Sequence, residues 1–124
     1  MVKIYYIVIL ALVFLAGCAG PQICNTADCF IADANECKAT SVEIKEEIGV
    51  VKYTSTQDCT FTKQIVSLDE SESQEMKNLL QGKMLSCSYE VGNFDQRWVN
   101  TLIDGIEICD GELKEIFGQL LILI

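Results

Sequence analysis

The chain has 124 residues, enough for one small domain, and its 18 acidic and 9 basic side chains give a formal net charge of −9 at pH 7. This charge argues against nucleic acid as a partner, because a phosphate backbone needs a stripe of lysine or arginine. Histidine is absent, which excludes imidazole-based nucleophile activation and argues against catalytic zinc. We therefore expect no cofactor, no metal and no nucleic-acid partner.

The N-terminal segment has the pattern of a signal peptide. Lys3 provides a basic start, and an apolar run of about 14 residues follows, shorter than the roughly 20 residues that a membrane-spanning helix needs. The run ends in Leu15-Ala16-Gly17-Cys18. This tetrapeptide resembles the lipobox of prokaryotic lipoproteins, in which the cysteine thiol carries a lipid and becomes the first residue of the mature chain.

The resemblance implies a domain organisation and a cellular location for the protein. It predicts a lipoprotein signal peptide over residues 1–17, a short lipidated tether over 18–23 and a single extracytoplasmic domain over 24–124. The tether from Ala19 to Ile23 reaches roughly 17 Å when extended. The domain is then expected on the outer face of the cytoplasmic membrane, anchored by the lipid on Cys18. An uncleaved helical anchor is the alternative, because the apolar run reaches about 17 residues when it is counted through Gly20.

A short helix and three strands are expected next. Asn25 or Thr26 can cap a helix, on which the apolar residues at i, i+4 and i+7 share one face. These three residues are Phe30, Ala34 and Cys37. Alternation of apolar and polar residues then predicts strands over 42–45, 51–54 and 59–65, with turns at Gly49 and at Gln57-Asp58. The pattern indicates an antiparallel meander.

A capped helix and a fourth strand are expected after the meander. Ser71 and Gln74 have the spacing of a capping box, and Gly82 is a stop signal. Between them lie the apolar residues Met76, Leu79 and Leu80. The segment MLSCSYE, residues 84–90, alternates and predicts a strand.

The C-terminal third predicts two further helices. Asn93 and Gln96 are expected to open a helix with one apolar face. That face holds Phe94, Trp98, Leu102, Ile106 and Cys109. A break near Asp110-Gly111 precedes a last helical stretch. The expected fold is α+β, a small antiparallel sheet of three to four strands packed with three to four helices and stapled by disulfides.

The cysteine count supports the lipobox. The chain has seven cysteines, an odd number, so disulfides within the chain leave at least one thiol over. In an exported protein such an extra thiol needs an explanation. With Cys18 assigned to the lipid, an even set remains, which in a small exported domain indicates a disulfide framework. The set is Cys24, Cys29, Cys37, Cys59, Cys87 and Cys109.

Alternatives for the six cysteines are a metal cluster or redox thiols. The chain has no Cys-x-x-Cys, so the zinc-ribbon and thioredoxin patterns both fail. Six cysteines allow 15 connectivities, and sequence alone does not choose among them. Cys87 with Cys109 and Cys37 with Cys59 are local pairs compatible with the expected elements.

Candidate contact residues lie in the C-terminal third. Arg97 and Trp98 are residue types favoured at binding hot spots, although Trp98 also fits core packing. The apolar C-terminus, including Leu120 and Leu121, either completes the core or contacts a partner or the membrane.

Catalytic and metal-ligating constellations are not evident. Without histidine a serine triad is impossible, and no Ser-x-x-Lys occurs. The acidic run of Asp69, Glu70, Glu72 and Glu75 lacks the residue order of a calcium loop. It favours the solvated start of a helix, where acids complement the helix dipole.

The body of the chain carries a second resemblance. The segments DCFIADANEC, CTFTKQIVSLDESE and GNFDQRWVN resemble small cysteine-bearing lipoproteins encoded in archaeal genomes. This resemblance implies no activity and no catalytic residue. We therefore expect a non-catalytic interaction module with an unidentified protein or small-molecule partner. The alternative is an extracytoplasmic redox (thiol–disulfide) or hydrolytic enzyme.

Overall fold

The computed structural model describes residues 22–122 of the chain, and the side chains of residues 22–120. The predicted signal peptide, the lipidation site Cys18 and the side chain of Leu121 lie outside the described residues.

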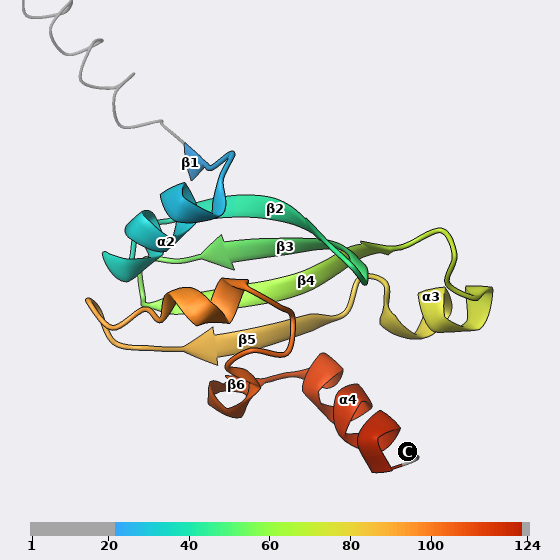
Figure 1. Ribbon diagram of the computed structural model, residues 1–124. Coiled ribbons are helices and arrows are strands. Elements are labelled where there is room, and N and C mark those ends of the chain that lie inside the picture. The colour runs from blue at the N-terminus through green and yellow to red at the C-terminus, as the bar shows by residue number, and fades with distance from the viewer. Residues whose placement is uncertain (1–21, 123–124) are drawn as a thin grey trace, which may run out of the picture.

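Six strands form one mixed sheet in chain order, with β1 at one edge and β6 at the other (Figure 1). The strands are β1 (Gln22–Ile23), β2 (Thr40–Glu46), β3 (Gly49–Ser55), β4 (Thr60–Leu68), β5 (Met84–Ser88) and β6 (Cys109–Asp110). β1 pairs in parallel with β2, and every other neighbouring pair is antiparallel. The predicted three-stranded meander is confirmed as β2 to β4, and the predicted fourth strand is confirmed as β5. The two edge strands enlarge the sheet, and each is too short to show an alternating pattern.

Within residues 22–122, three α-helices accompany the sheet: α2 (Ala27–Asn35), α3 (Gln74–Leu80) and α4 (Glu112–Ile122). The Thr26 hydroxyl caps α2 by accepting the Cys29 N–H at 3.2 Å. Of the two predicted caps, Asn25 and Thr26, the structure therefore confirms Thr26. The predicted cap of α3 is wrong by two residues. The Ser73 hydroxyl accepts the Met76 N–H at 3.2 Å, whereas Ser71 donates to the Asp69 carboxylate in the preceding turn.

The helix predicted from Asn93 to Cys109 does not form. Two short 3₁₀ helices, η1 (Gln96–Val99) and η2 (Ile106–Ile108), occupy the segment, and Cys109 lies on β6. Between them the chain turns at Gly105, whose φ is +80° and where a Cβ would clash with the Trp98 indole. In a continuous helix, the main-chain carbonyls of this segment would accept hydrogen bonds from within the helix. Three of them, between residues 101 and 104, instead accept hydrogen bonds from Lys63 of β4.

The core lies on one face of the sheet, under α2 and η1 (Figure 1). Phe61 of β4 stacks on Trp98 at a centroid distance of 5.5 Å, and Phe30 of α2 meets Tyr53 of β3 at 6.1 Å. The opposite face is polar. Its central register row crosses four strands and consists of Ser41, Thr54, Thr62 and Ser86. The fold is thus a two-layer α+β arrangement with one apolar sheet face.

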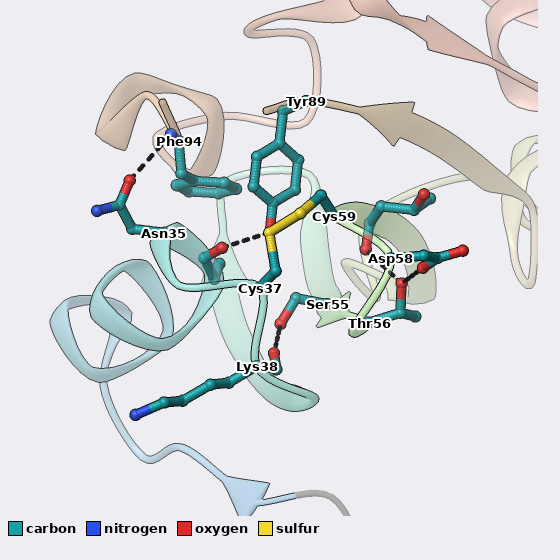
Figure 2. Close-up of a disulfide and its surroundings, with 11 residues drawn as sticks. Asn35, Cys37, Lys38, Ser55, Thr56, Asp58, Cys59, Tyr89 and Phe94 are labelled. Atoms are coloured by element: carbon teal, nitrogen blue, oxygen red, sulfur yellow. Dashed lines mark hydrogen bonds between the residues drawn. A yellow bond between two sulfur atoms is a disulfide. The ribbon is translucent and has the colours of Figure 1, made fainter. Parts of the chain in front are cut away.

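All six cysteines of the described chain are paired, as Cys24–Cys29, Cys37–Cys59 and Cys87–Cys109. The predicted framework and both local pairs are confirmed. Cys87 and Cys109 are direct register partners on β5 and β6. Figure 2 shows the Tyr89 ring beside the Cys37–Cys59 bridge. Three disulfides in so small a domain are characteristic of an oxidising, extracytoplasmic compartment.

Candidate ligand groove

An open groove with a volume of about 640 Å³ lies between the β2–β3 turn, residues 100–103 and α4. Its apolar walls are Ile44, Ile48, Leu102, Ile103 and Phe117. Its polar lining consists of Lys45, Glu46, Glu47, Asn100 and Thr101. This combination of apolar walls with a few polar groups is typical of ligand-binding sites.

The β2–β3 hairpin forms the first wall of the groove. Glu46 and Gly49 face each other in register, so the connection is as short as Glu47-Ile48. Gly49 has a φ of +145°, and a Cβ there would collide with the Ser67 carbonyl of β4. Only glycine therefore lets β3 begin against β4, and this tight approach presents Ile48 to the groove.

The second wall, residues 100–103, is held by the buried side chain of Lys63. Its Nζ donates to the carbonyl oxygens of Thr101 at 3.0 Å, Leu102 at 3.3 Å and Asp104 at 2.6 Å. Lys63 is fully buried, and its three ammonium hydrogens match these three acceptors. The lysine therefore positions the loop and is not a free nucleophile.

Tyr53 and Glu46 complete a polar layer beneath the groove. The Tyr53 hydroxyl donates to the Glu46 carboxylate, and the Lys63 ammonium lies 5.7 Å from the Tyr53 ring centroid. Burial lowers the pKa of Lys63 to about 8, while nearby Asp104, Glu46 and Glu107 oppose that shift. Burial, followed by the hydrogen bond to Glu46, raises the pKa of Tyr53 well above its usual range.

The predicted contact residues Arg97 and Trp98 line a second, smaller pocket of about 420 Å³. Arg97 is exposed and pairs with Asp95 at 2.6 Å, while Trp98 is half-buried in the aromatic core. Ile103 lines both pockets. Leu120 is half-buried and follows the groove residue Phe117 on α4.

Sequence reasoning missed the groove itself. Its walls come from the β2–β3 turn, a loop and α4, which are distant in the chain. The signal that was available is the presence of apolar residues in turns, at Ile48 and Ile103. Ile103 is 59% exposed, which is unusual for an isoleucine beside the core.

One cluster in the described chain has the composition of a metal site. The Cys24 and Cys29 sulfurs and an Asp33 carboxylate oxygen lie within 4.8 Å of one another. The two sulfurs are bonded to each other, so they do not offer thiolates to a metal. The acidic residues 69, 70, 72 and 75 are exposed around the start of α3, as expected for a solvated helix start.

Comparison of the chain with protein-family models, with curated proteins and with solved structures finds no match. Among the helices within residues 22–122, none has the length and apolarity needed to cross a membrane.

Proposed function

We propose that this protein is a lipid-anchored, extracytoplasmic interaction module that binds a protein partner in the groove between the β2–β3 turn, residues 100–103 and α4. The observation that carries the proposal is the open apolar groove with acidic residues in its lining. The lipobox-like motif at residues 15–18 and the three disulfides support the location.

The lining of the groove favours a segment with apolar and basic side chains. Ile44, Ile103 and Phe117 offer apolar contacts. In the described part of the chain, the charged lining consists of the carboxylates of Glu46 and Glu47 and the single ammonium group of Lys45, so negative charge is in excess. Once Lys3 is removed with the signal peptide, 8 basic side chains remain against 18 acidic ones, a formal charge of −10. Such a surface attracts a basic partner and repels an acidic one.

The chemistry around the groove supports binding over catalysis. Lys63, the buried amine nearest to it, donates to three main-chain carbonyls. Tyr53 is hydrogen-bonded to Glu46. Both groups are thus engaged in structural hydrogen bonds, whereas a catalytic nucleophile needs access to substrate and an adjacent base.

A matched pair of peptides tests the proposal. Each contains the same aromatic and aliphatic residues, flanked by lysines in one peptide and by glutamates in the other. We expect the lysine peptide to shift the NMR signals of Ile44, Ile103 and Phe117, and to bind at least about tenfold more tightly than its glutamate counterpart, because charge complementarity contributes on this scale.

Two exposed residues provide the variant and its control. Ile103→Glu places a charge in the groove and should abolish binding of the lysine peptide. Val91→Glu alters a residue that is 65% exposed and is not part of the groove, so it should leave binding unchanged. Equal binding of both peptides, or shifts that map away from the groove, would contradict the proposal.

A further inference from the structure

The Cys24–Cys29 bridge lies at the corner where β1 leads into α2, a site separate from the groove. Cys24 follows the end of β1, and Cys29 is the third residue of α2. The Cys24 side chain is only 3% exposed, whereas Cys29 is half-buried. A thiolate approaching from solvent therefore reaches the Cys29 sulfur, and Cys24 is the sulfur that departs.

The surroundings of Cys24 suit a departing sulfur. The Thr40 Oγ1 lies 3.1 Å from the Cys24 Sγ. Since a bridged sulfur carries no hydrogen, the Thr40 hydroxyl is the donor in this contact. Thr40 is fully buried, so its hydroxyl is held in place by the packing. The same hydrogen bond stabilises negative charge on Cys24 when the S–S bond breaks.

Asp33 supplies the complementary group. Its Oδ2 lies 3.6 Å from the Cys24 Sγ, on the same helix as Cys29. After reduction, the Cys24 thiol has a hydrogen to donate, and the Asp33 carboxylate is placed to accept it. The Thr40 hydroxyl thus stabilises the departing thiolate, whereas the Asp33 carboxylate favours the protonated thiol that forms from it.

The other two bridges both differ in reach, and Cys87–Cys109 differs also in burial, whereas Cys37 and Cys59 are half-buried like Cys29. Cys24–Cys29 spans 5 residues, whereas Cys37–Cys59 and Cys87–Cys109 each span 22. Loop-closure entropy makes the short bridge contribute about tenfold less to the folding equilibrium than either long one. Cys87 and Cys109 are also almost fully buried. Opening Cys24–Cys29 therefore leaves the two bridges that tie distant parts of the fold together.

We propose that Cys24–Cys29 is an exchangeable disulfide that reacts with an extracytoplasmic dithiol, while the other two bridges are structural. One thiol of the dithiol loses its proton to solvent and attacks the Cys29 Sγ, and the Cys24 thiolate departs and takes up a proton. The second thiol of the dithiol, also deprotonated, then displaces Cys29 as a thiolate, which takes up a proton. Two electrons pass from the dithiol, which becomes a disulfide, to the cysteine pair.

Timed reduction of the full-length protein with dithiothreitol tests the proposal. Released thiols are trapped by alkylation and located by peptide mass spectrometry. We expect Cys24 and Cys29 to be alkylated at least about tenfold faster than the other four bridged cysteines. Release of a different pair first, or simultaneous release of all six, would overturn the proposal.

Thr40→Val tests the role of the buried hydroxyl. It should slow the release of Cys24 and Cys29 by about tenfold, because one hydrogen bond to the departing sulfur is lost. Thr62→Val, on the opposite face of the sheet, is the matched control and should leave the rate unchanged. An unaltered or faster rate in Thr40→Val would reject the assigned role of Thr40 and with it the exchange site.

Single-cysteine variants test the direction of attack in a second way. In Cys24→Ala, Cys29 should react rapidly with 2,2′-dithiodipyridine. In Cys29→Ala, the buried Cys24 should react at least about tenfold more slowly, since access governs exchange. Equal rates would show that the two sulfurs are not distinguished. None of these measurements involves the groove, so their outcome is independent of peptide binding.

Discussion

Cys37 and Cys59 are joined by a disulfide and both adopt the left-handed backbone region, with φ values of 54° and 59°. Cys37 follows the end of α2, where its N–H donates to the Ala34 carbonyl at 2.9 Å. The next N–H, of Lys38, donates to the Asp33 carbonyl at 3.0 Å. These two bonds form a Schellman motif, in which glycine is the usual residue at the position of Cys37.

Cys59 has the same role in the β3–β4 hairpin. It follows the turn at Gln57-Asp58, and the Thr56 N–H donates to the Thr60 carbonyl at 2.9 Å. Glycine is again the residue that such a hairpin prefers. Each left-handed L-residue costs roughly 1–2 kcal/mol. The disulfide therefore occupies two positions that would otherwise favour glycine, and its stabilisation has to exceed that cost.

The stability of two double variants measures this balance. Cys37→Ala/Cys59→Ala should lower the free energy of unfolding by about 3 kcal/mol, because it opens a loop of 22 residues. Cys37→Gly/Cys59→Gly should recover about 1–2 kcal/mol of that loss, because removing the steric cost at two positions returns roughly 2–4 kcal/mol and the greater unfolded-state entropy of two glycines takes back about 1–2 kcal/mol. Urea denaturation of both variants is the measurement. A glycine variant no more stable than the alanine variant would show that the backbone cost is absent.

At the scale of elements, the segment from η1 to η2 shows how a tertiary contact overrides a local pattern. Its apolar residues recur with helical spacing, yet three carbonyls between residues 101 and 104 bond to Lys63, about forty positions earlier in the chain. A buried ammonium group needs acceptors, since leaving it without them costs several kcal/mol. The loop satisfies that need by giving up its helical hydrogen bonds, and it becomes a wall of the groove.

The stability of this contact should depend on pH. The folded pKa of Lys63, about 8, lies below the ordinary 10.5. Between these values the unfolded chain binds more protons than the folded one, so stability should rise with pH across this window. We expect a gain on the order of 2 kcal/mol between pH 7.5 and 9.5. Urea denaturation at the two pH values measures it.

The titrations of Lys63 and Tyr53, which both lie in the polar layer beneath the groove, affect stability in different pH ranges. Lys63→Met removes the titrating amine, so the rise between pH 7.5 and 9.5 should disappear, although the variant is less stable overall because it frees three carbonyls. The titration of Tyr53 has the opposite effect, because it lowers stability as the pH rises. Since its folded pKa is raised, its contribution to stability is present below pH 10 and is lost above it. A wild-type stability that falls between pH 7.5 and 9.5 would refute the assignment to Lys63.

At the scale of the whole molecule, the N-terminal edge and the groove lie at opposite ends of β2, because β1 pairs with Thr40 and Ser41 whereas the groove begins at Ile44. β1 and β6 lie at opposite edges of the sheet, with α4 beyond β6 (Figure 1). Five strand spacings of about 4.8 Å put these edges roughly 24 Å apart. With a lipid on Cys18, the tether of 18–23 would hold the β1 edge nearest to the membrane. The Cys24–Cys29 bridge would then lie close to the lipid surface, and α4 would point away from it.

The anchor itself is tested by substitution of its cysteine. Cys18→Ser removes the thiol that would carry the lipid, and it should prevent both lipidation and the cleavage that follows. Mass spectrometry of the membrane-extracted wild-type protein should find a mature chain that begins with lipid-modified Cys18. A wild-type chain with an intact Met1, or one without a lipid on Cys18, would contradict the anchor.

Local patterns in the sequence were enough to determine α2, the three-stranded meander of β2 to β4, the fourth strand β5, α4 and the disulfide framework. Alternation with period two and helix caps act within a few neighbouring residues, so they can be recognised without knowledge of the fold. The local pairs Cys37–Cys59 and Cys87–Cys109 fitted these elements, although sequence alone did not select them.

Only the tertiary structure decided the edge strands, the path of residues 96–108 and the groove. Two-residue strands such as β6 depend on a partner already in place, here Cys109 beside Cys87. The contacts of Lys63 with residues 101–104 and the convergence of Ile44, Ile103 and Phe117 join segments far apart in the chain. Such contacts follow from packing and from the need to satisfy buried polar groups, and neither leaves a periodic trace in the sequence.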